Sequence, residues 1–372
     1  MEIGLRVKCN RTELLEALQI TQKGVSARSM LPILSGILFK AEKNALSLSA
    51  TDLEMSIRTR IQVKEEEGGS IVVPARLFSD ILNNIQEETI EMSLIKEKNQ
   101  LEILAGESRF DVNVLYEEDF PKIPLAPEIP ACKVESAGLS RVIREVVKAA
   151  SRDEAKPILS GVLTEIDEKS LKMVATDSYR LAICEEKIGS GPEEPIRVII
   201  PSRCLKEVGR IISAISSEET LINLTDNQII FRLGETEVVC RLIEGEYPHY
   251  QQLLPENCEK KIRLNKERVI GAARRVSLLA QDNTPIKLTF GNNLLVMSAS
   301  TQDVGEALER LDVEYPEEEV KIAFNPGYFV DGVASIDGDE LFLEMTDPLK
   351  PAVMRPTKGE DFLYLVMPVR IS

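Results

Sequence analysis

The sequence has few of the residues on which many enzymes depend. It contains one histidine, His249, no tryptophan, and only 5% aromatic residues. A Ser-His-Asp or Cys-His device would have to use His249, which lies in a proline-flanked loop. Neither a phosphate-binding P-loop nor a dinucleotide-binding glycine motif is found. The absence of these motifs makes an enzyme a weak interpretation. The low aromatic content also argues against a protein that binds nucleic acid by stacking its bases on aromatic side chains.

Cysteine pairs of the kind that hold zinc or act in redox centres are also missing. The six cysteines are scattered, and the closest two, Cys240 and Cys258, are 18 residues apart. This spacing predicts free, mostly buried thiols in a reducing compartment. Asp337 and Asp339 lack the rest of a calcium loop, so they indicate a β-turn. We expect no metal and no cofactor.

No apolar run approaches the roughly 18 residues that span a bilayer. The N-terminal segment lacks the apolar core of a signal peptide. These two absences predict a cytoplasmic protein, nucleoid-associated if it binds DNA, with no membrane partner.

The charge is strongly negative overall, at −16. This alone argues against a nucleic-acid binder, because phosphate affinity comes from cations. The cations are nevertheless grouped at helical spacing, in one stripe of Arg141, Arg144, Lys148 and Arg152 and a second of Arg203, Lys206 and Arg210. Since nucleic acid responds to the local field as well as to the total charge, sorting of charge by face answers the objection.

The stretch PILSG occurs twice, at 32–36 and 157–161, and marks an internal repeat. Thr51-Asp52 and Thr176-Asp177 keep the same offset of 125 residues. VVPARLF at 72–78 and EDFPKIP at 118–124 match IIPSRCL at 199–205 and GEYPHYQ at 245–251. A fainter third copy includes 284–301 and 323–329. Ordered recurrence of several anchors predicts three domains, 1–125, 126–254 and 255–372.

Each copy has the same pattern of elements. A strand (6–9, 132–135 or 261–264) precedes an amphipathic helix (11–22, 138–151 or 266–280). Alternating strands follow, then a second helix that begins near Ala75 or Ser202, and further hairpins. PILSG is expected to begin a strand. The fold class is therefore α+β, with two helices packed on antiparallel sheet in each domain.

Three segments are the most specific of all: TDSYRLA at 176–182, YPHYQQLLP at 247–255 and MPVR at 367–370. With the triplicated domains and the basic helices, they resemble the beta subunit of bacterial DNA polymerase III, the sliding-clamp family. The resemblance covers the whole chain in order.

The resemblance implies a head-to-tail dimeric ring that encircles duplex DNA and slides without sequence specificity. The DNA-facing cations implied are Arg28, Arg76, Arg144, Lys148, Arg152, Arg203, Lys206 and Arg210. The implied homodimer interface comprises Ile81, Ile85, Arg109, Phe110, Val112, Leu278 and Leu279. Alternatively, the apolar side chains of four of these residues pack in the core of the chain and not between subunits: Ile81, Ile85, Leu278 and Leu279.

The resemblance also implies a groove that binds peptides of the DNA polymerase III catalytic subunit, the clamp loader and other proteins with a clamp-binding motif. The residues that match are Leu159, Thr176, Ser178, Tyr179, Arg180, Leu181, Pro248, Leu253, Leu349, Pro351, Leu365, Met367, Pro368, Val369 and Arg370. Ser178 stands where the family usually has glycine. Two or three apolar anchors would give roughly micromolar affinity. The alternative is that these residues are ordinary core.

Two other functions compete with a non-catalytic processivity factor. The first is a monomeric peptide-binding scaffold with no DNA role, which would not need the basic stripes. The second is a hydrolase that uses some of the 61 carboxylates, although no spacing singles out a pair.

Overall fold

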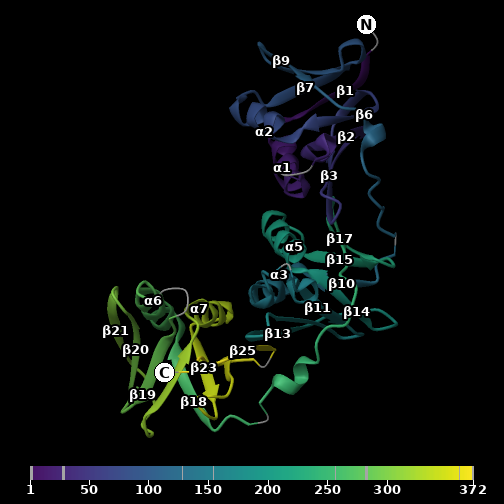
Figure 1. Ribbon diagram of the computed structural model, residues 1–372. Helices are drawn as coiled ribbons and strands as arrows, with labels where there is room; N and C mark the ends of the chain where they lie inside the picture. Colours follow the sequence, from purple (N-terminus) through teal and green to yellow (C-terminus); the bar gives the residue numbers. More distant parts are fainter. Residues whose placement is uncertain are drawn as a thin grey trace. The chain divides into compact units, whose positions relative to one another are not determined.

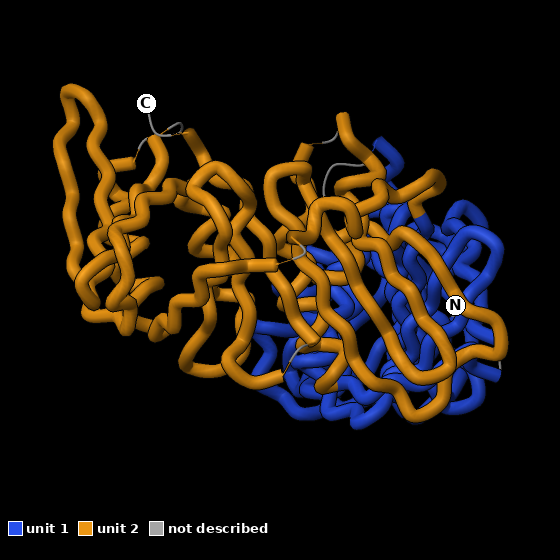
Figure 2. The backbone as a smooth tube through the Cα atoms, turned by 90° about the horizontal axis from the view of Figure 1, so that it is seen from below, with its two compact units in different colours: residues 1–136, 207–242 blue, residues 137–206, 243–372 orange. Residues whose placement is uncertain are grey.

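The structure is a computed structural model that describes residues 3–26, 30–127, 129–153, 155–255, 257–280, 284–359 and 361–370 (Figure 1). The chain forms two compact units. Unit 1 comprises residues 1–136 and 207–242, and unit 2 comprises 137–206 and 243–372 (Figure 2).

Unit 1 contains two antiparallel sheets. The first has the order β5 (Lys64–Glu67), β1 (Ile3–Asn10), β7 (Thr89–Ile95), β8 (Gln100–Ala105) and β9 (Ser108–Asn113). The second has eight strands, in the order β10 (Cys132–Glu135), β15 (Glu219–Leu224), β16 (Gln228–Leu233), β17 (Thr236–Arg241), β4 (Met55–Gln62), β3 (Ala45–Thr51), β2 (Gly36–Glu42) and β6 (Gly69–Pro74).

The helices α1 (Arg11–Thr21) and α2 (Ala75–Asn84) cover the core of unit 1. Asn10 caps α1, because its side chain accepts hydrogen bonds from the backbone N–H groups of Thr12 and Glu13. Phe78 of α2 meets Phe39 of β2 edge to face, with 5.1 Å between the ring centroids. The helices therefore pack on the inner face of β2, β3 and β4, and the opposite face of those strands is left to other segments.

Unit 2 also contains two antiparallel sheets. One has eight strands, in the order β14 (Ile196–Pro201), β11 (Gly161–Ile166), β12 (Ser170–Thr176), β13 (Arg180–Lys187), β25 (Phe362–Val366), β24 (Ala352–Pro356), β23 (Glu340–Met345) and β18 (Lys260–Asn265). The other has the order β21 (Gly305–Asp312), β20 (Leu294–Thr301), β19 (Ile286–Gly291) and β22 (Val320–Phe324).

Helices α6 (Lys266–Ser277) and α7 (Pro326–Ser335) pack against each other in unit 2. The helix α3 (Ser136–Val146) begins where unit 2 begins, and α5 (Ser202–Ala214) runs across the division between the units. A single turn, α4 (Pro157–Ser160), precedes β11. Of the helices in the described ranges, none is both long and apolar enough to cross a membrane.

The predicted repeat is confirmed at the level of elements. The strands β4, β13 and β21 each have eight residues and begin 125 residues apart, at 55, 180 and 305. The compact units do not follow the repeats, because β4 of the first copy pairs with β17 of the second and β13 of the second pairs with β25 of the third. The boundaries after residues 125 and 254 stay a prediction.

The expectation that PILSG begins a strand is wrong in detail. Residues 32–35 and 157–160 each form one helical turn, and the strand starts at the glycine, Gly36 or Gly161. Proline at the first position suits a helical turn, since its φ is already fixed. An added methyl group at either glycine would lie 2.4 Å from a side chain of the neighbouring strand. Close packing of strands therefore requires glycine at both places.

The six cysteines are free, as predicted, and all except Cys258 are buried.

Candidate functional site

A tight turn joins β12 to β13 and forms the centre of the candidate site. The carboxylate of Asp177 accepts hydrogen bonds from the backbone N–H groups of Tyr179 and Arg180, at 2.9 and 3.0 Å. The hydroxyl of Thr176 accepts one from the N–H of Ser178 and donates to the carbonyl of Arg180. These bonds hold Ser178 at φ 82°, in the left-handed region.

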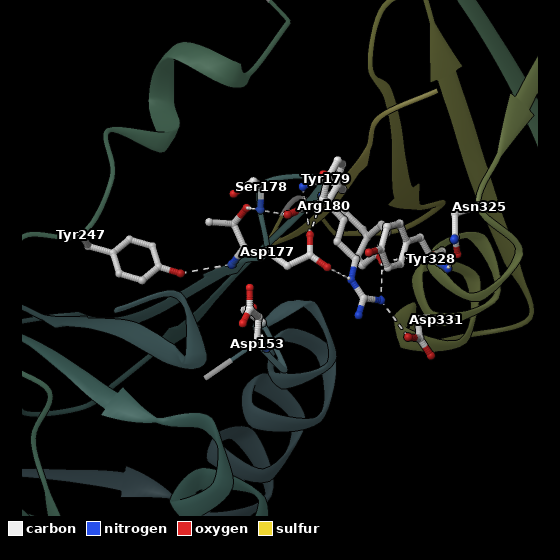
Figure 3. A network of polar contacts seen from close by, with 12 residues as sticks. Asp153, Asp177, Ser178, Tyr179, Arg180, Tyr247, Asn325, Tyr328 and Asp331 are labelled. Atoms are coloured by element: carbon white, nitrogen blue, oxygen red, sulfur yellow. Dashed lines mark hydrogen bonds and ion pairs between the residues drawn. The ribbon is translucent and has the colours of Figure 1, made fainter. Parts of the chain in front are cut away.

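Arg180, the last residue of this turn, is 4% exposed and points towards α7 (Figure 3). Its Nε lies 3.0 Å from a carboxylate oxygen of Asp177, and its Nη1 lies 2.7 Å from one of Asp331 on α7. The same Nη1 is 3.3 Å from the hydroxyl of Tyr364, which donates to the carbonyl of Tyr328. The guanidinium therefore joins β13, α7 and β25.

The charge of Arg180 is secured by these neighbours. Burial alone lowers the pKa of a guanidinium, but Tyr364, Asp331 and Asp177 outweigh burial and raise it. Arg180 also lies 4.4 Å from the centroid of the Tyr328 ring, a distance suited to a cation–π interaction. Gly332 makes room for this arrangement, because a methyl group there would lie 2.5 Å from the Tyr364 ring.

The pairing of β13 with β25 brings together predicted residues from distant parts of the chain. Arg180 is opposite Val366, and Leu181 is opposite Leu365. Beyond the strand, the N–H of Met367 donates to the carbonyl of Tyr179 at 2.9 Å. The C-terminal segment 367–370 thus continues from the strand that pairs with the turn.

A second segment, 247–255, is fixed beside the same turn. The hydroxyl of Tyr247 accepts a hydrogen bond from the N–H of Thr176 at 3.1 Å. Tyr247 and Tyr250 are buried in an apolar cluster with Leu181 and Leu365. Pro248 and Leu253 belong to this segment, and Leu349 and Pro351 lead into β24, which pairs with β25.

The predicted groove residues divide into a buried set and an exposed set. Leu181, Leu365, Thr176 and Arg180 are buried, and Leu159 is half-buried. The large apolar side chains that stay exposed are Tyr179, Leu253, Leu349, Met367 and Val369. The alternative of ordinary core thus fits Leu181 and Leu365 but not this exposed set. Exposed apolar side chains around a rigid, hydrogen-bonded turn are typical of a binding surface.

Sequence reasoning missed the residues of α7 that complete the site. Tyr328 stacks on Tyr179 with 6.3 Å between ring centroids and 23° between planes, and Asp331 pairs with Arg180. Asn325 caps α7 by accepting from the N–H of Tyr328, which fixes the start of the helix. A signal was available in the segment NPGYFVDG, where the tyrosine and the aspartate are three residues apart, on one helix face.

Comparisons with known proteins agree over the full length. Models of the DNA polymerase III beta subunit match in order: the N-terminal domain over residues 5–124, the central domain over 133–249 and the C-terminal domain over 251–370. The beta sliding clamp of Staphylococcus epidermidis is 34% identical, over 97% of this chain and 98% of its own. The chain belongs to the DNA polymerase III beta subunit family. The beta sliding clamp of Streptomyces coelicolor is 31% identical, over 99% of this chain and 100% of its own.

Solved structures of sliding clamps have the same fold. The Bacillus subtilis clamp is 28% identical with a TM-score of 0.93, and a Pseudomonas aeruginosa clamp bound to griselimycin is 29% identical with a TM-score of 0.91. Each comparison covers 99% of this chain and 100% of the other. The predicted family and the α+β fold of three clamp domains are confirmed.

The cations predicted to face DNA in a clamp have different surroundings. Arg28 lies outside the described residues. Arg76 on α2 and Arg144 on α3 are exposed, and Arg144 lies 3.6 Å from Asp337. Lys148 is half-buried; burial lowers its pKa and Asp331 offsets part of the effect. Arg152 is exposed.

The basic stripe predicted along 138–151 is not continuous. The helix α3 ends at Val146, so Lys148 and Arg152 lie beyond its last α-helical turn. Arg141 is half-buried and ion-paired, with its guanidinium 2.7 Å from Glu186 and 2.9 Å from Asp361. On α5, by contrast, the predicted spacing is helical and the side chains are exposed: Arg203, Lys206 and Arg210, the last of which pairs with Glu207.

The predicted dimer residues also divide by burial. Ile81 and Ile85 are buried in the core of unit 1, and Phe110 packs against it. Arg109 on β9 is exposed and pairs with Glu102 and Asp111, while Val112 is buried. Leu278, directly after α6, is 81% exposed, and Leu279 is half-buried.

Proposed function

We propose that this chain is a non-catalytic DNA polymerase processivity factor that works as a closed ring of two copies around duplex DNA. The observation that carries the proposal is that two edge strands, β9 and β21, have no further strand paired to them among the described residues. β9 is the last strand of the five-stranded sheet, and β21 is the last strand of the four-stranded sheet. An open edge strand is an aggregation hazard unless something covers it.

The repeat says what should cover these edges. Two sets of strands are equivalent in the three repeats. One set is β9, β17 and β25, and the other is β4, β13 and β21. β17 pairs with β4, and β25 pairs with β13. Among the described residues, the equivalent pairing of β9 with β21 is not made within one chain, and a second copy can supply it in a head-to-tail arrangement.

The two observed pairings also predict the register of the third. Val238 is opposite Ile57, and Tyr364 is opposite Ala182. Carried over to the remaining edges, this register sets Phe110 of one copy opposite Ala307 of the other. Arg109, Phe110 and Val112 would then belong to the contact, with Leu278 and Leu279 on the α6 side.

The DNA contacts of such a ring need not be strong. Topological linkage retains the duplex, and cations on the helices attract phosphates without reading sequence. We assign this role to the cations of α2, α3 and α5 and of the turn after α3: Arg76, Arg144, Lys148, Arg152, Arg203, Lys206 and Arg210. All are exposed except Lys148, which is half-buried. Arg28 stays part of this prediction. Work on DNA would place the protein in the cytoplasm, at the nucleoid.

The site around Arg180 would tether the polymerase, the clamp loader and repair factors. A short peptide could add its apolar side chains to Tyr179, Leu253, Leu349, Met367 and Val369, which are exposed. Burial of each Leu or Phe anchor contributes about 1.5–3 kcal/mol. Micromolar affinity follows from two or three anchors and suits partners that must exchange.

Retention on circular DNA tests the ring. After loader-assisted assembly on nicked circles, we expect the protein to stay until the DNA is linearised and then to run off the ends. A Phe110→Cys, Ala307→Cys chain, oxidised after loading, should stay on circles through a high-salt wash, whereas either single variant should not. Equal retention on circular and linear DNA would show binding by contacts alone. Failure to load at all would favour a monomeric peptide-binding scaffold.

A further inference from the structure

Unit 1 has a hollow of about 830 Å³ on the outer face of its eight-stranded sheet, opposite the face that α1 covers. Its floor is formed by alternate residues of β2, β3 and β4, such as Lys40, Ser47 and Arg58. The side chains between them, such as Phe39 and Leu48, point the other way into the core. One wall is the segment 120–125, which links the first repeat to the second.

This hollow is the counterpart, one repeat earlier, of the surface on which Tyr247 and Tyr250 pack in unit 2. Phe120 and Ile123 stand 127 residues before those tyrosines. They pack on a smaller apolar cluster with Leu34, Leu38 and Val72. The architecture around the two surfaces is therefore the same, and their chemistry can be compared strand by strand.

The central cross-strand row differs in character between the two surfaces. In unit 2 paired residues across four strands are all apolar: Leu163, Val174, Ile183 and Leu363. In unit 1 the row in the same register is Leu38, Ser49, Arg58 and Glu237. Arg58 lies 3.1 Å from Glu237 and donates to the carbonyl of Ile123, so it also fastens the wall to the floor.

The neighbouring row has opposite charge in the two units. In unit 2 it reads Glu165, Lys172 and Glu185, and the lysine lies 3.2 Å from Glu185. In unit 1 it reads Lys40, Ser47 and Arg60. Beside the surface under Tyr247 and Tyr250, the neighbouring row in unit 2 is therefore acidic and ion-paired. Beside the hollow in unit 1, the same row is cationic.

Two cations that line this hollow form no ion pair within the described residues. Arg60 and Lys122 are exposed and have no ion-pair partner there, whereas Arg58 and Arg232 share Glu237. Lys40 lies 3.9 Å from Glu42. Leu125, on the wall, is 76% exposed. Unpaired cations beside an exposed apolar side chain, in a chain of net charge −16, define a ligand that is both acidic and apolar.

We propose that the hollow is a second docking site, which binds an acidic segment of a partner protein. Carboxylates of the segment would pair with Arg60 and Lys122, and an apolar side chain between them would pack on Leu125 and Leu38. The site would be distinct from the one around Arg180, so one chain could hold two partner segments of different chemistry.

A peptide fits this hollow better than a nucleic acid does. Four glutamates line it beside the six cations, so a continuous row of phosphates would meet carboxylates as well: Glu42, Glu117, Glu235 and Glu237. Phe120 is buried and offers no face on which a base could stack. A segment with two or three carboxylates can match the two unpaired cations without facing the acids.

Fluorescence polarisation with a labelled hexapeptide of alternating aspartate and leucine tests the proposal on the full chain. We expect micromolar binding that weakens with salt, and at least tenfold weaker binding of the same peptide with asparagine for aspartate. Arg60→Glu with Lys122→Glu should lower the affinity at least tenfold. Lys64→Glu, an exposed cation on the other sheet of unit 1, should not change it.

Further variants keep the outcome decisive. Arg60→Gln with Lys122→Gln replaces the charge reversal if that chain does not fold. Weaker binding by Tyr179→Ala, with unchanged binding by the double variants, would place the peptide at the site around Arg180 and overturn the proposal. Equal binding by the double variants, equal binding of the asparagine peptide, or no binding at all would overturn the proposal. Displacement of the peptide by an equal concentration of oligothymidylate would instead show a site for polyanions.

Discussion

The turn at 176–180 in unit 2 and the turn at 51–55 in unit 1 have the same backbone and different uses. In each, the threonine hydroxyl accepts from the N–H two residues on and donates to the carbonyl four residues on. In each, the aspartate carboxylate accepts from the N–H groups two and three residues on, at 2.8–3.1 Å. The turn is a property of the repeat, and the candidate site is built on one copy of it.

What was added is one charged residue and its partners. The last residue of the first turn is Met55, which is buried and opposite Cys240 on β17. Its counterpart Arg180 is opposite Val366 and reaches Asp331 on α7. The candidate site therefore differs from the first turn by an arginine that lies between two acids, on a backbone that both turns share.

Removal of that arginine should have the largest effect on unit 2. Arg180→Met gives the second turn the residue of the first and leaves Asp177, Asp331 and Tyr364 short of a partner. Loss of one member of a buried ion pair costs about 3–5 kcal/mol, so protection of the β13 amides from hydrogen exchange should fall accordingly. Hydrogen exchange is preferable to a single melting curve, because two units need not unfold together.

The matched control removes the two unpaired carboxylates and does not restore the arginine. In Arg180→Met with Asp177→Asn and Asp331→Asn, the amide of residue 177 can still accept from the turn, and no unpaired charge remains. Part of the lost protection should return. If the triple variant is no better protected than Arg180→Met, the ion pairs are not what stabilises the turn.

The two units also differ at one position on the first helix of the repeat, α1 in the first copy and α3 in the second. In unit 2 Glu145 is 1% exposed, accepts from the thiol of Cys184 at 2.9 Å and lies 3.4 Å from Arg141. The residue 125 positions earlier is Ile20 on α1. Burial raises the pKa of Glu145, and the bonds from Cys184 and Arg141 offset only part of that.

A raised carboxyl pKa has a definite sign in the pH dependence of stability. The folded chain holds the Glu145 proton more tightly than the unfolded chain, so the free energy of unfolding falls as the pH rises from about 4.3, the unfolded value, through the folded pKa. Glu145→Gln should abolish this loss, and the gap between variant and wild type should widen over that window and then stay constant. A gap independent of pH would mean that Glu145 does not titrate between the two states.

The sequence predicted the elements better than it predicted the surroundings of single side chains. Periodicity located the strands and helices because the repeat offers three copies of each. Periodicity could not show that α3 ends at Val146, nor that Arg141 turns inward to Glu186 and Asp361, since those acids come from distant strands and loops. The resemblance supplied the residues of the turn, but Asp331 and Tyr364 meet Arg180 only after β13 pairs with β25.

The smallest expected effect is the change in stability when the third residue of each turn is replaced by glycine. Ser178 and Leu53 have φ values of 82° and 77°, where a side chain is disfavoured by about 1–2 kcal/mol and glycine is not. Glycine costs about 0.5–1 kcal/mol more entropy on folding, so Ser178→Gly should stabilise the turn by about 0.5 kcal/mol. Leu53→Gly should give less, because Leu53 is only 56% exposed and loses its packing. Hydrogen exchange of β13 and β4 measures both. An equal gain in the two turns would mean that relief of backbone strain alone sets the gain and that the packing of Leu53 contributes nothing.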